Sequence, residues 1–169
     1  LDVAVIGGGD TALEEACYLA KMCNKVYLVH RRDKFRASQA MQDKAAKTPN
    51  IEFVMNSIPQ EILGEKKGFV KRVTGLQLLN KETNELNTIE IRGVFVAIGV
   101  TPVTDLFKGQ LDLDEQGYII TQGNRPLTNV PGVFAAGDVQ DPLYRQAITA
   151  AASGCKAAVE AERFLMENE

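Results

Sequence analysis

A glycine-rich segment close to the start of the chain has the residue types and spacing of a dinucleotide-binding turn. Gly7, Gly9 and Ala12 fall on a G-x-G-x-x-A pattern directly after the apolar run 3–6. In such a turn the first glycine permits a tight bend, the second lets the backbone approach a pyrophosphate, and the alanine lets helix and strand pack closely. The start of the following helix presents unpaired N–H groups and a positive dipole to phosphate. The pattern alone is weak evidence, since many strand-to-helix turns use glycine.

Basic residues follow the next predicted strand, where the ribose of an adenine dinucleotide is recognised. In an NAD site an acidic side chain about twenty residues after the glycines binds the ribose 2′-OH. Here the corresponding place holds His30, and Arg31, Arg32 and Arg36 follow it. Guanidinium groups bind a 2′-phosphate through charge-assisted hydrogen bonds, whereas a carboxylate would repel it. Coupled to the glycine turn, the arginines favour NADPH over NADH, although an isolated segment of this kind is more often a solvated basic loop.

His30 is the only histidine in the chain. No aspartate or serine lies at a spacing that would make it a catalytic base, so we expect it to be structural or to lie on the ribose side of the site. Asp10, at the start of the first predicted helix, is a plausible cap for that helix.

A second segment with binding chemistry lies near the end of the chain. The apolar run from residue 132 ends at Gly137 and Asp138, and open α/β sheets bind ligands at the carboxyl ends of their strands. A helix that starts near residues 145–147 would direct free N–H groups at an electron-rich ligand. A flavin meets that demand, because reduction places negative charge on the N1–C2=O edge of its ring. A capping aspartate before a tightly packed core helix explains the same residues equally well.

The elements that must position these residues follow from the hydrophobic pattern. Runs of consecutive apolar residues predict strands of a parallel sheet that are buried on both faces, and apolar residues at helical spacing predict the helices between them. Apolar and polar residues that alternate between 60 and 91 predict an antiparallel meander. The fold class is therefore α/β, a Rossmann-like parallel sheet with a β-meander on one face and helices on the other, the three-layer ββα type. The predicted strands are 3–6, 25–30, 51–55, 60–64, 70–79, 86–91 and 93–99, and the predicted helices are 10–22 and 37–47.

A proline-containing turn at residues 101–107 marks the predicted domain boundary. It separates a nucleotide-binding domain, 1–101, from a second segment, 102–169. The second segment offers one strand or hairpin at 111–120, an apolar strand at 132–138 and a long helix from about 144 to 166. So few elements cannot close a core of their own, so we expect this segment to be part of a larger domain. Because the sequence begins inside a strand, we expect it to be a piece of a longer chain.

Composition narrows the class of function. A net charge of −3 gives no global attraction to nucleic acid or to a membrane surface, and no apolar run is long enough to span a bilayer. The three cysteines form neither a C-x-x-C pair nor a zinc-like spacing, so no metal site is expected. Their number and spacing suit a reducing, cytoplasmic setting.

Taken together, the motifs resemble those of the low-molecular-weight, bacterial-type thioredoxin reductases over the whole length of the chain. The matching stretches are VAVIGGGDTALEEA, HRRDKFRA, GVFVAIG, NVPGVFAAGDV and YRQAITAAASGC. The resemblance implies an enzyme that binds FAD and NADPH, reduces a C-x-x-C disulfide through the flavin and passes the electrons to thioredoxin, commonly as a homodimer. Two related flavoproteins, a ferredoxin–NADP reductase and the partner of a peroxiredoxin, are alternatives, as is a truncated, non-enzymatic NADPH-binding module.

The resemblance also implies which residues bind the two cofactors. Asp138 would hold the ribityl chain of the flavin, and Arg145, Gln146 and Ala147 would line its ring. The full predicted set is Gly7, Gly8, Gly9, Asp10, Thr11, His30, Arg31, Arg32, Arg36, Ile98, Gly99, Gly137, Asp138, Val139, Arg145, Gln146 and Ala147. The family's redox C-x-x-C and its FAD pyrophosphate turn do not occur in these 169 residues, so no catalytic residue is predicted and the chain alone is expected to be inactive.

Overall fold

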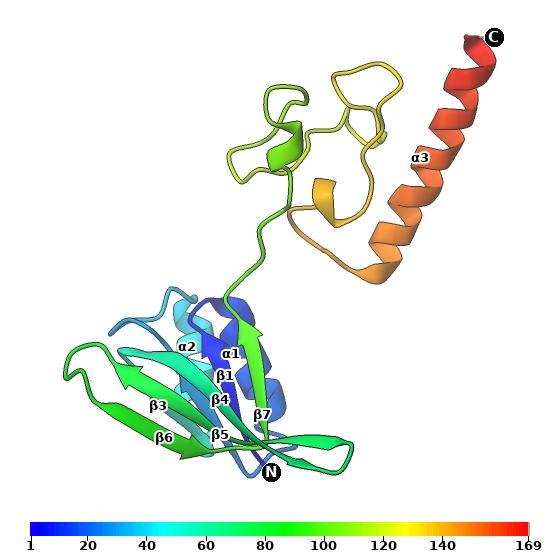
Figure 1. The fold of residues 1–169 in the computed structure, drawn as a ribbon. Coiled ribbons are helices and arrows are strands. Elements are labelled where there is room, and N and C mark those ends of the chain that lie inside the picture. Colours follow the sequence, from blue (N-terminus) through cyan, green and yellow to red (C-terminus); the bar gives the residue numbers. More distant parts are fainter. Residues whose placement is uncertain (169) are drawn as a thin grey trace. The chain divides into compact units, whose positions relative to one another are not determined.

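The computed structural model describes residues 1–168, which form two compact units, 1–99 and 100–168. The first unit contains a four-stranded parallel sheet with the strand order β3-β2-β1-β7 (Figure 1). Its strands are β1 (Asp2–Gly7), β2 (Lys25–Val29), β3 (Ile51–Val54) and β7 (Gly93–Ala97). This order places the carboxyl ends of β1, β2 and β7 side by side, where the glycine turn and the arginines follow.

The antiparallel meander is a separate three-stranded sheet with the order β4-β5-β6. Its strands are β4 (Ser57–Lys67), β5 (Val70–Asn80) and β6 (Leu86–Glu90). The sequence predicted a turn at 65–68, but β4 continues to Lys67 because Glu65 pairs with Arg72 across the strands. Opposite charges at such a position stabilise the pair, and Gly68, with φ +62°, then makes a two-residue turn possible.

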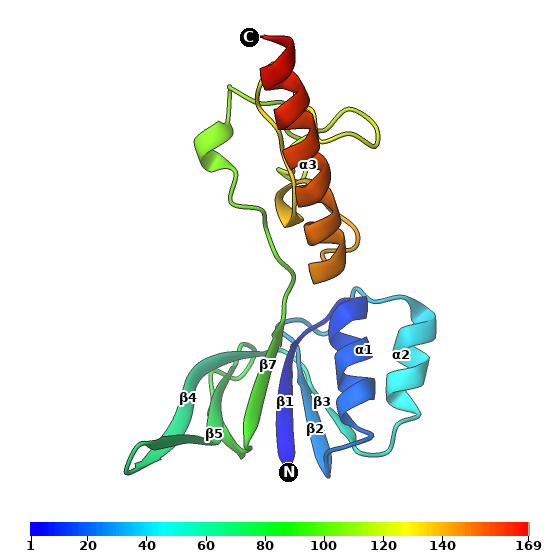
Figure 2. The ribbon, with the colours of Figure 1, turned by 90° about the vertical axis from the view of Figure 1, so that its right-hand side faces the viewer.

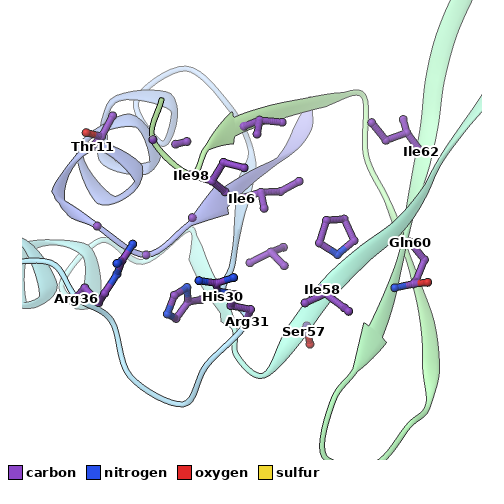
Figure 3. A pocket seen from close by; sticks show the side chains of 18 of the residues that line it. Ile6, Thr11, His30, Arg31, Arg36, Ser57, Ile58, Gln60, Ile62 and Ile98 are labelled. Atoms are coloured by element: carbon purple, nitrogen blue, oxygen red, sulfur yellow. The ribbon is translucent and has the colours of Figure 1, made fainter. Parts of the chain in front are cut away.

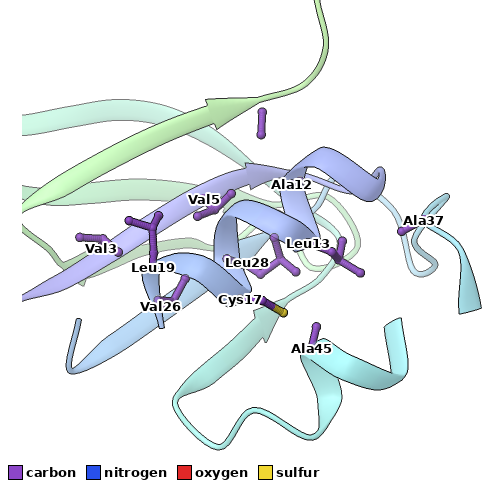
Figure 4. Packing of buried hydrophobic residues seen from close by; sticks show 12 residues of the cluster. Val3, Val5, Ala12, Leu13, Cys17, Leu19, Val26, Leu28, Ala37 and Ala45 are labelled. Carbon is purple, nitrogen blue, oxygen red and sulfur yellow. The ribbon is translucent and has the colours of Figure 1, made fainter. Parts of the chain in front are cut away.

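The parallel sheet is covered on both faces, as predicted from strands that are apolar at consecutive positions (Figure 2). Alternate residues of each strand face opposite layers: Val5 and Leu28 pack under the helices, while Ala4 and Val29 pack against the meander. All four side chains are completely buried. Figure 4 shows the helix-side cluster, which includes Ala12. The predicted three-layer arrangement is confirmed.

Both helices of the first unit lie on one face of the parallel sheet (Figure 2). They are α1 (Asp10–Leu19) and α2 (Gln39–Ala46). The sequence predicted that α1 would continue to residue 22, but the backbone turns after Leu19. The reason is Asn50, whose side-chain amide donates to the carbonyls of Ala20 and Cys23 at 2.8 and 3.0 Å and so satisfies groups that a longer helix would have used.

The second unit contains one long helix, α3 (Ala147–Glu167), and two short 3₁₀ turns, η1 (Asp105–Phe107) and η2 (Asp138–Gln140). Its apolar cluster is small, with Leu111, Ile119 and Ala135 as the buried members. None of the helices described within residues 1–168 is long and apolar enough to cross a membrane.

The strand predicted at 132–138 is absent from the described residues, whereas 111–120, predicted as a strand or hairpin, forms a short hairpin. The segment 111–120 forms a tight turn at Asp114 with one antiparallel bridge, Leu113 to Ile119. The segment 132–138 makes one bridge, Leu127 to Phe134. An apolar run becomes a strand only where a neighbouring strand pairs with it along its length, and among the described residues of this unit these runs make isolated bridges.

The long helix starts at Ala147, which agrees with the predicted start near 145–147 and is later than the bound of about 144. The carboxylate of Asp141 accepts hydrogen bonds from the backbone N–H groups of Leu143, Tyr144 and Arg145 at 2.9–3.0 Å. These bonds hold the three residues in a turn, and Arg145 has a left-handed φ of +50°. Gln146 then caps α3.

Candidate functional site

A cavity of about 590 Å³ opens at the carboxyl ends of β1, β2 and β7, and Figure 3 shows its lining side chains. It contains nine of the eleven residues that the sequence predicted in the first unit; Asp10 and Arg32 are the two that do not line it. The nine are Gly7, Gly8, Gly9, Thr11, His30, Arg31, Arg36, Ile98 and Gly99. The glycine turn and two of the three arginines therefore line the same cavity.

The three glycines of the turn have different surroundings. A Cβ on Gly7 would lie 2.4 Å from the carbonyl oxygen of Ala97 and 2.6 Å from the Cβ of Ala12, so this glycine allows β1, β7 and α1 to pack closely. A Cβ on Gly9 would have no atom within 4 Å. Gly9 is also the N-cap of α1. The open space above it, at the start of a helix, suits the approach of a phosphate group.

The ring of His30 packs against Gly8 of the glycine turn, as expected of a structural histidine. Its ring is buried, and a Cβ on Gly8 would lie 2.2 Å from the ring. Nε2 donates to the carbonyl of Lys34 at 3.0 Å, and the ring lies 5.4 Å from that of Phe35. Burial is the main cause that lowers the pKa of His30, and the neighbouring arginines add to it. The fold therefore favours the neutral form of the imidazole.

This neutral imidazole makes the unfolding free energy dependent on pH. Because the pKa of His30 is lowered in the folded state, the unfolded chain binds more protons below a pH of about 6.5, and acid destabilises the fold. We expect the unfolding free energy to fall more steeply between pH 7 and 5 in the wild-type chain than in a His30→Gln variant. Denaturant titrations at several pH values measure both slopes, and equal slopes would contradict a buried neutral imidazole.

The backbone of the arginine loop, residues 31–37, is fastened to the glycine turn. The carbonyl of Gly8 accepts hydrogen bonds from the N–H groups of Arg36 and Ala37 at 2.7 and 3.1 Å. The side chains of Arg31 and Arg36 line the cavity, and none of the three arginines takes part in an ion pair among residues 1–168. Arg31 and Arg36 thus present positive charge to the cavity (Figure 3).

Asp10 does not cap its own helix, which corrects the expectation from sequence. Gly9 is the N-cap of α1, and no side chain caps that end. The carboxylate of Asp10 instead accepts two hydrogen bonds from Ser38, from the N–H at 3.0 Å and from the hydroxyl at 2.7 Å. The hydroxyl bond is the main cause that holds the pKa of Asp10 below its usual range.

The sequence analysis did not identify the contribution of the meander to this cavity. The first six residues of β4, 57–62, line one wall, and Figure 3 shows Ser57, Ile58, Gln60 and Ile62 there. The pairing of β4 with β5 shifts register between Pro59 and Glu61, and such an irregularity changes which side chains face a given side. Ile6, Val29, Val96 and Ala97 complete the lining. An irregular register is not visible in the sequence.

The predicted flavin-site residues of the second unit lie at η2 and at the start of α3. Gly137 has φ +81°, no atom lies within 4 Å of the position of a Cβ, and its N–H donates to the hydroxyl of Ser153 at 2.9 Å. Asp138 and Val139 follow in η2. Arg145, Gln146 and Ala147 are exposed. A nearby cavity of about 340 Å³ is lined by other residues, among them Gln140, Asp141, Tyr144, Thr149 and Ser153.

Comparison with known proteins assigns the family. Residues 1–154 match the family described as pyridine nucleotide-disulphide oxidoreductase. The chain belongs to this family.

Individual relatives share a more specific name. The chain is 53% identical over 164 residues to a thioredoxin reductase of Rickettsia prowazekii and 54% identical to one of Chlamydia pneumoniae, matching 97% of this chain and 52% and 51% of those proteins. Among solved structures, thioredoxin reductase from Giardia duodenalis has a TM-score of 0.79 at 47% identity, and that from Streptococcus pyogenes 0.83 at 36%. Each covers 98% of this chain and 53% of its own length. The chain spans about half the length of the relatives that it matches, and the resemblance to thioredoxin reductases is confirmed.

Proposed function

We propose that the first unit is the NADPH-binding domain of a flavoprotein disulfide reductase that acts on thioredoxin. The observation that carries the proposal is the cavity that joins the glycine turn to Arg31 and Arg36. Gly9 offers open space at the start of α1 for a pyrophosphate. The two arginines, exposed and outside any described ion pair, supply the donors that a 2′-phosphate requires.

The second unit supplies part of the FAD-binding domain in this proposal. Gly137 and Asp138 would hold the ribityl chain, and Arg145 and the start of α3 would lie at the flavin ring. The positive φ of Gly137 and the open space beside it fit the close approach of a ligand to the backbone. When bound, the nicotinamide and the flavin supply the hydride chemistry that reduces a disulfide. The proposed protein is cytoplasmic and homodimeric.

The three cysteines take no part in the proposed disulfide reduction. Cys17 is buried in the helix-side cluster, Cys23 follows the end of α1, and Cys155 lies on α3. No two of them form a C-x-x-C pair. The reducible disulfide of the proposed reaction therefore belongs to residues other than these 169, and the chain's own residues serve to bind and orient the two nucleotides.

One sample of the purified chain tests both cofactor assignments. Titration calorimetry with NADPH and with NADH is expected to give the tighter binding for NADPH, because only NADPH carries a 2′-phosphate for Arg31 and Arg36. After addition of FAD and removal of the excess, a visible absorbance band in the protein fraction supports the flavin site. Equal affinity for the two nicotinamide nucleotides would overturn the NADPH assignment, and a colourless protein fraction would overturn flavin binding by these residues.

A further inference from the structure

We infer that Asp10 is a positioning residue that sets the preference for NADPH by holding the arginine loop against the glycine turn. The inference rests on the proposed NADPH site and adds a residue that acts without touching the nucleotide. Its basis is the pair of hydrogen bonds that join Asp10 on α1 to Ser38, the residue directly before α2. We call this pair the Asp10–Ser38 link.

The link adds two hydrogen bonds at the end of the arginine loop. At its start, His30 is buried and exchanges backbone hydrogen bonds with Val54 and Ser57. At its end, the loop is held by the Gly8 carbonyl and then by the Asp10–Ser38 link. Arg36 is two residues from Ser38. A shift of Ser38 would therefore move the Arg36 guanidinium relative to the cavity.

The link also determines where the negative charge of Asp10 lies. The carboxylate occupies the first turn of α1, the position at which a helix binds an anionic ligand. A carboxylate aimed into the cavity would repel a pyrophosphate. Gly9 and Thr11 line the cavity but Asp10 does not, because Ser38 holds its carboxylate on the α2 side. One pair of hydrogen bonds thus orders the loop and keeps a like charge away from the phosphates.

The chemistry of the link gives a matched set of variants. Asp10→Ala removes the acceptor, whereas Asp10→Asn keeps a side-chain oxygen that both Ser38 donors can use. Ser38→Ala removes the hydroxyl but leaves the backbone N–H. We expect the ratio of NADPH to NADH affinity to fall about three- to tenfold in Asp10→Ala and by less in Ser38→Ala. The ratio should stay close to that of the wild type in Asp10→Asn. Asp10 is exposed, so the unfolding midpoint should change little in all three variants.

The readout is the ratio of the two affinities, measured by calorimetric titration of the full chain, with Arg31→Ala as the reference for a lost phosphate contact. A purely structural role for Asp10 would lower both affinities together. An unchanged ratio in Asp10→Ala, or an equal fall in Asp10→Asn, would overturn the inference. A wild-type chain that binds NADPH and NADH equally would instead overturn the proposed function, so the two failures are distinguishable.

Discussion

Replacement of Arg31 by alanine is expected to weaken the binding of NADPH by about tenfold or more and to leave the affinity for NADH nearly unchanged. Loss of a charge-assisted hydrogen bond costs about 1.5–3 kcal/mol, which corresponds to roughly ten- to hundredfold in affinity. Arg36→Ala should act in the same direction, since both guanidinium groups line the cavity. The difference between the two coenzymes, rather than either affinity alone, is the quantity to measure.

Arg32 provides the matched control for this experiment. It adjoins Arg31 in the sequence and is equally exposed, but it does not line the cavity. Arg32→Ala removes the same charge from the same loop and should reduce the preference for NADPH much less than Arg31→Ala. NADPH titrations at two salt concentrations separate a direct contact from the long-range attraction of the positively charged loop, because salt screens the long-range attraction more strongly. If Arg32→Ala and Arg31→Ala had equal effects, the 2′-phosphate would not lie on the cavity side of the loop.

Substitution in the glycine turn should separate folding from binding. Gly9→Ser adds a side chain where nothing lies within 4 Å, and serine is also a favoured N-cap, so the fold should keep its stability. The same side chain occupies the space proposed for the pyrophosphate. An added group in a filled site costs about 1–3 kcal/mol, so both NADPH and NADH should bind roughly ten- to hundredfold more weakly.

Gly7→Ala is the contrasting variant. Its methyl group would collide with the Ala97 carbonyl at 2.4 Å and with the side chain of Ala12 at 2.6 Å. Neither neighbour is the flexible end of a long side chain, so β1 or α1 must shift, at a cost of about 1–3 kcal/mol in the free energy of unfolding. Thermal unfolding and calorimetry on the two variants give the comparison. A Gly9→Ser chain that binds NADPH as the wild type does would place the pyrophosphate elsewhere.

The layers of the first unit could be predicted from sequence because they depend on local patterns. Residues 3–6 are apolar at every position, which indicates a strand buried on both faces, and Val5 and Ala4 do pack against opposite layers. The alternation in 70–79 likewise indicates a sheet with one covered face, and Leu76 and Leu78 are its buried side chains. Such patterns carry the information within a few residues.

Features that depend on distant partners could not be predicted in this way. Asp10 has the sequence position of a helix cap, but its partner Ser38 lies 28 residues further on. The β4 wall of the cavity depends on a register shift against β5. The run 132–138 has the composition of a strand, but strand formation depends on neighbours, and it makes a single bridge. In each case the deciding interaction joins segments that are not adjacent in sequence.

The two hydrogen bonds to the Gly8 carbonyl have an evolutionary consequence. They come from backbone N–H groups at positions 36 and 37, so replacing the exposed side chains of Arg31, Arg32 or Arg36 leaves both bonds in place. If these residues bind the 2′-phosphate as proposed, point mutations at 31 and 36 that exchange guanidinium for carboxylate would change the preferred coenzyme and keep these backbone bonds. Proline is the exception at 36 and 37, since it lacks the N–H. In the proposed NADPH site, coenzyme choice would thus be carried by a few exposed side chains on a loop whose backbone is hydrogen-bonded to the glycine turn.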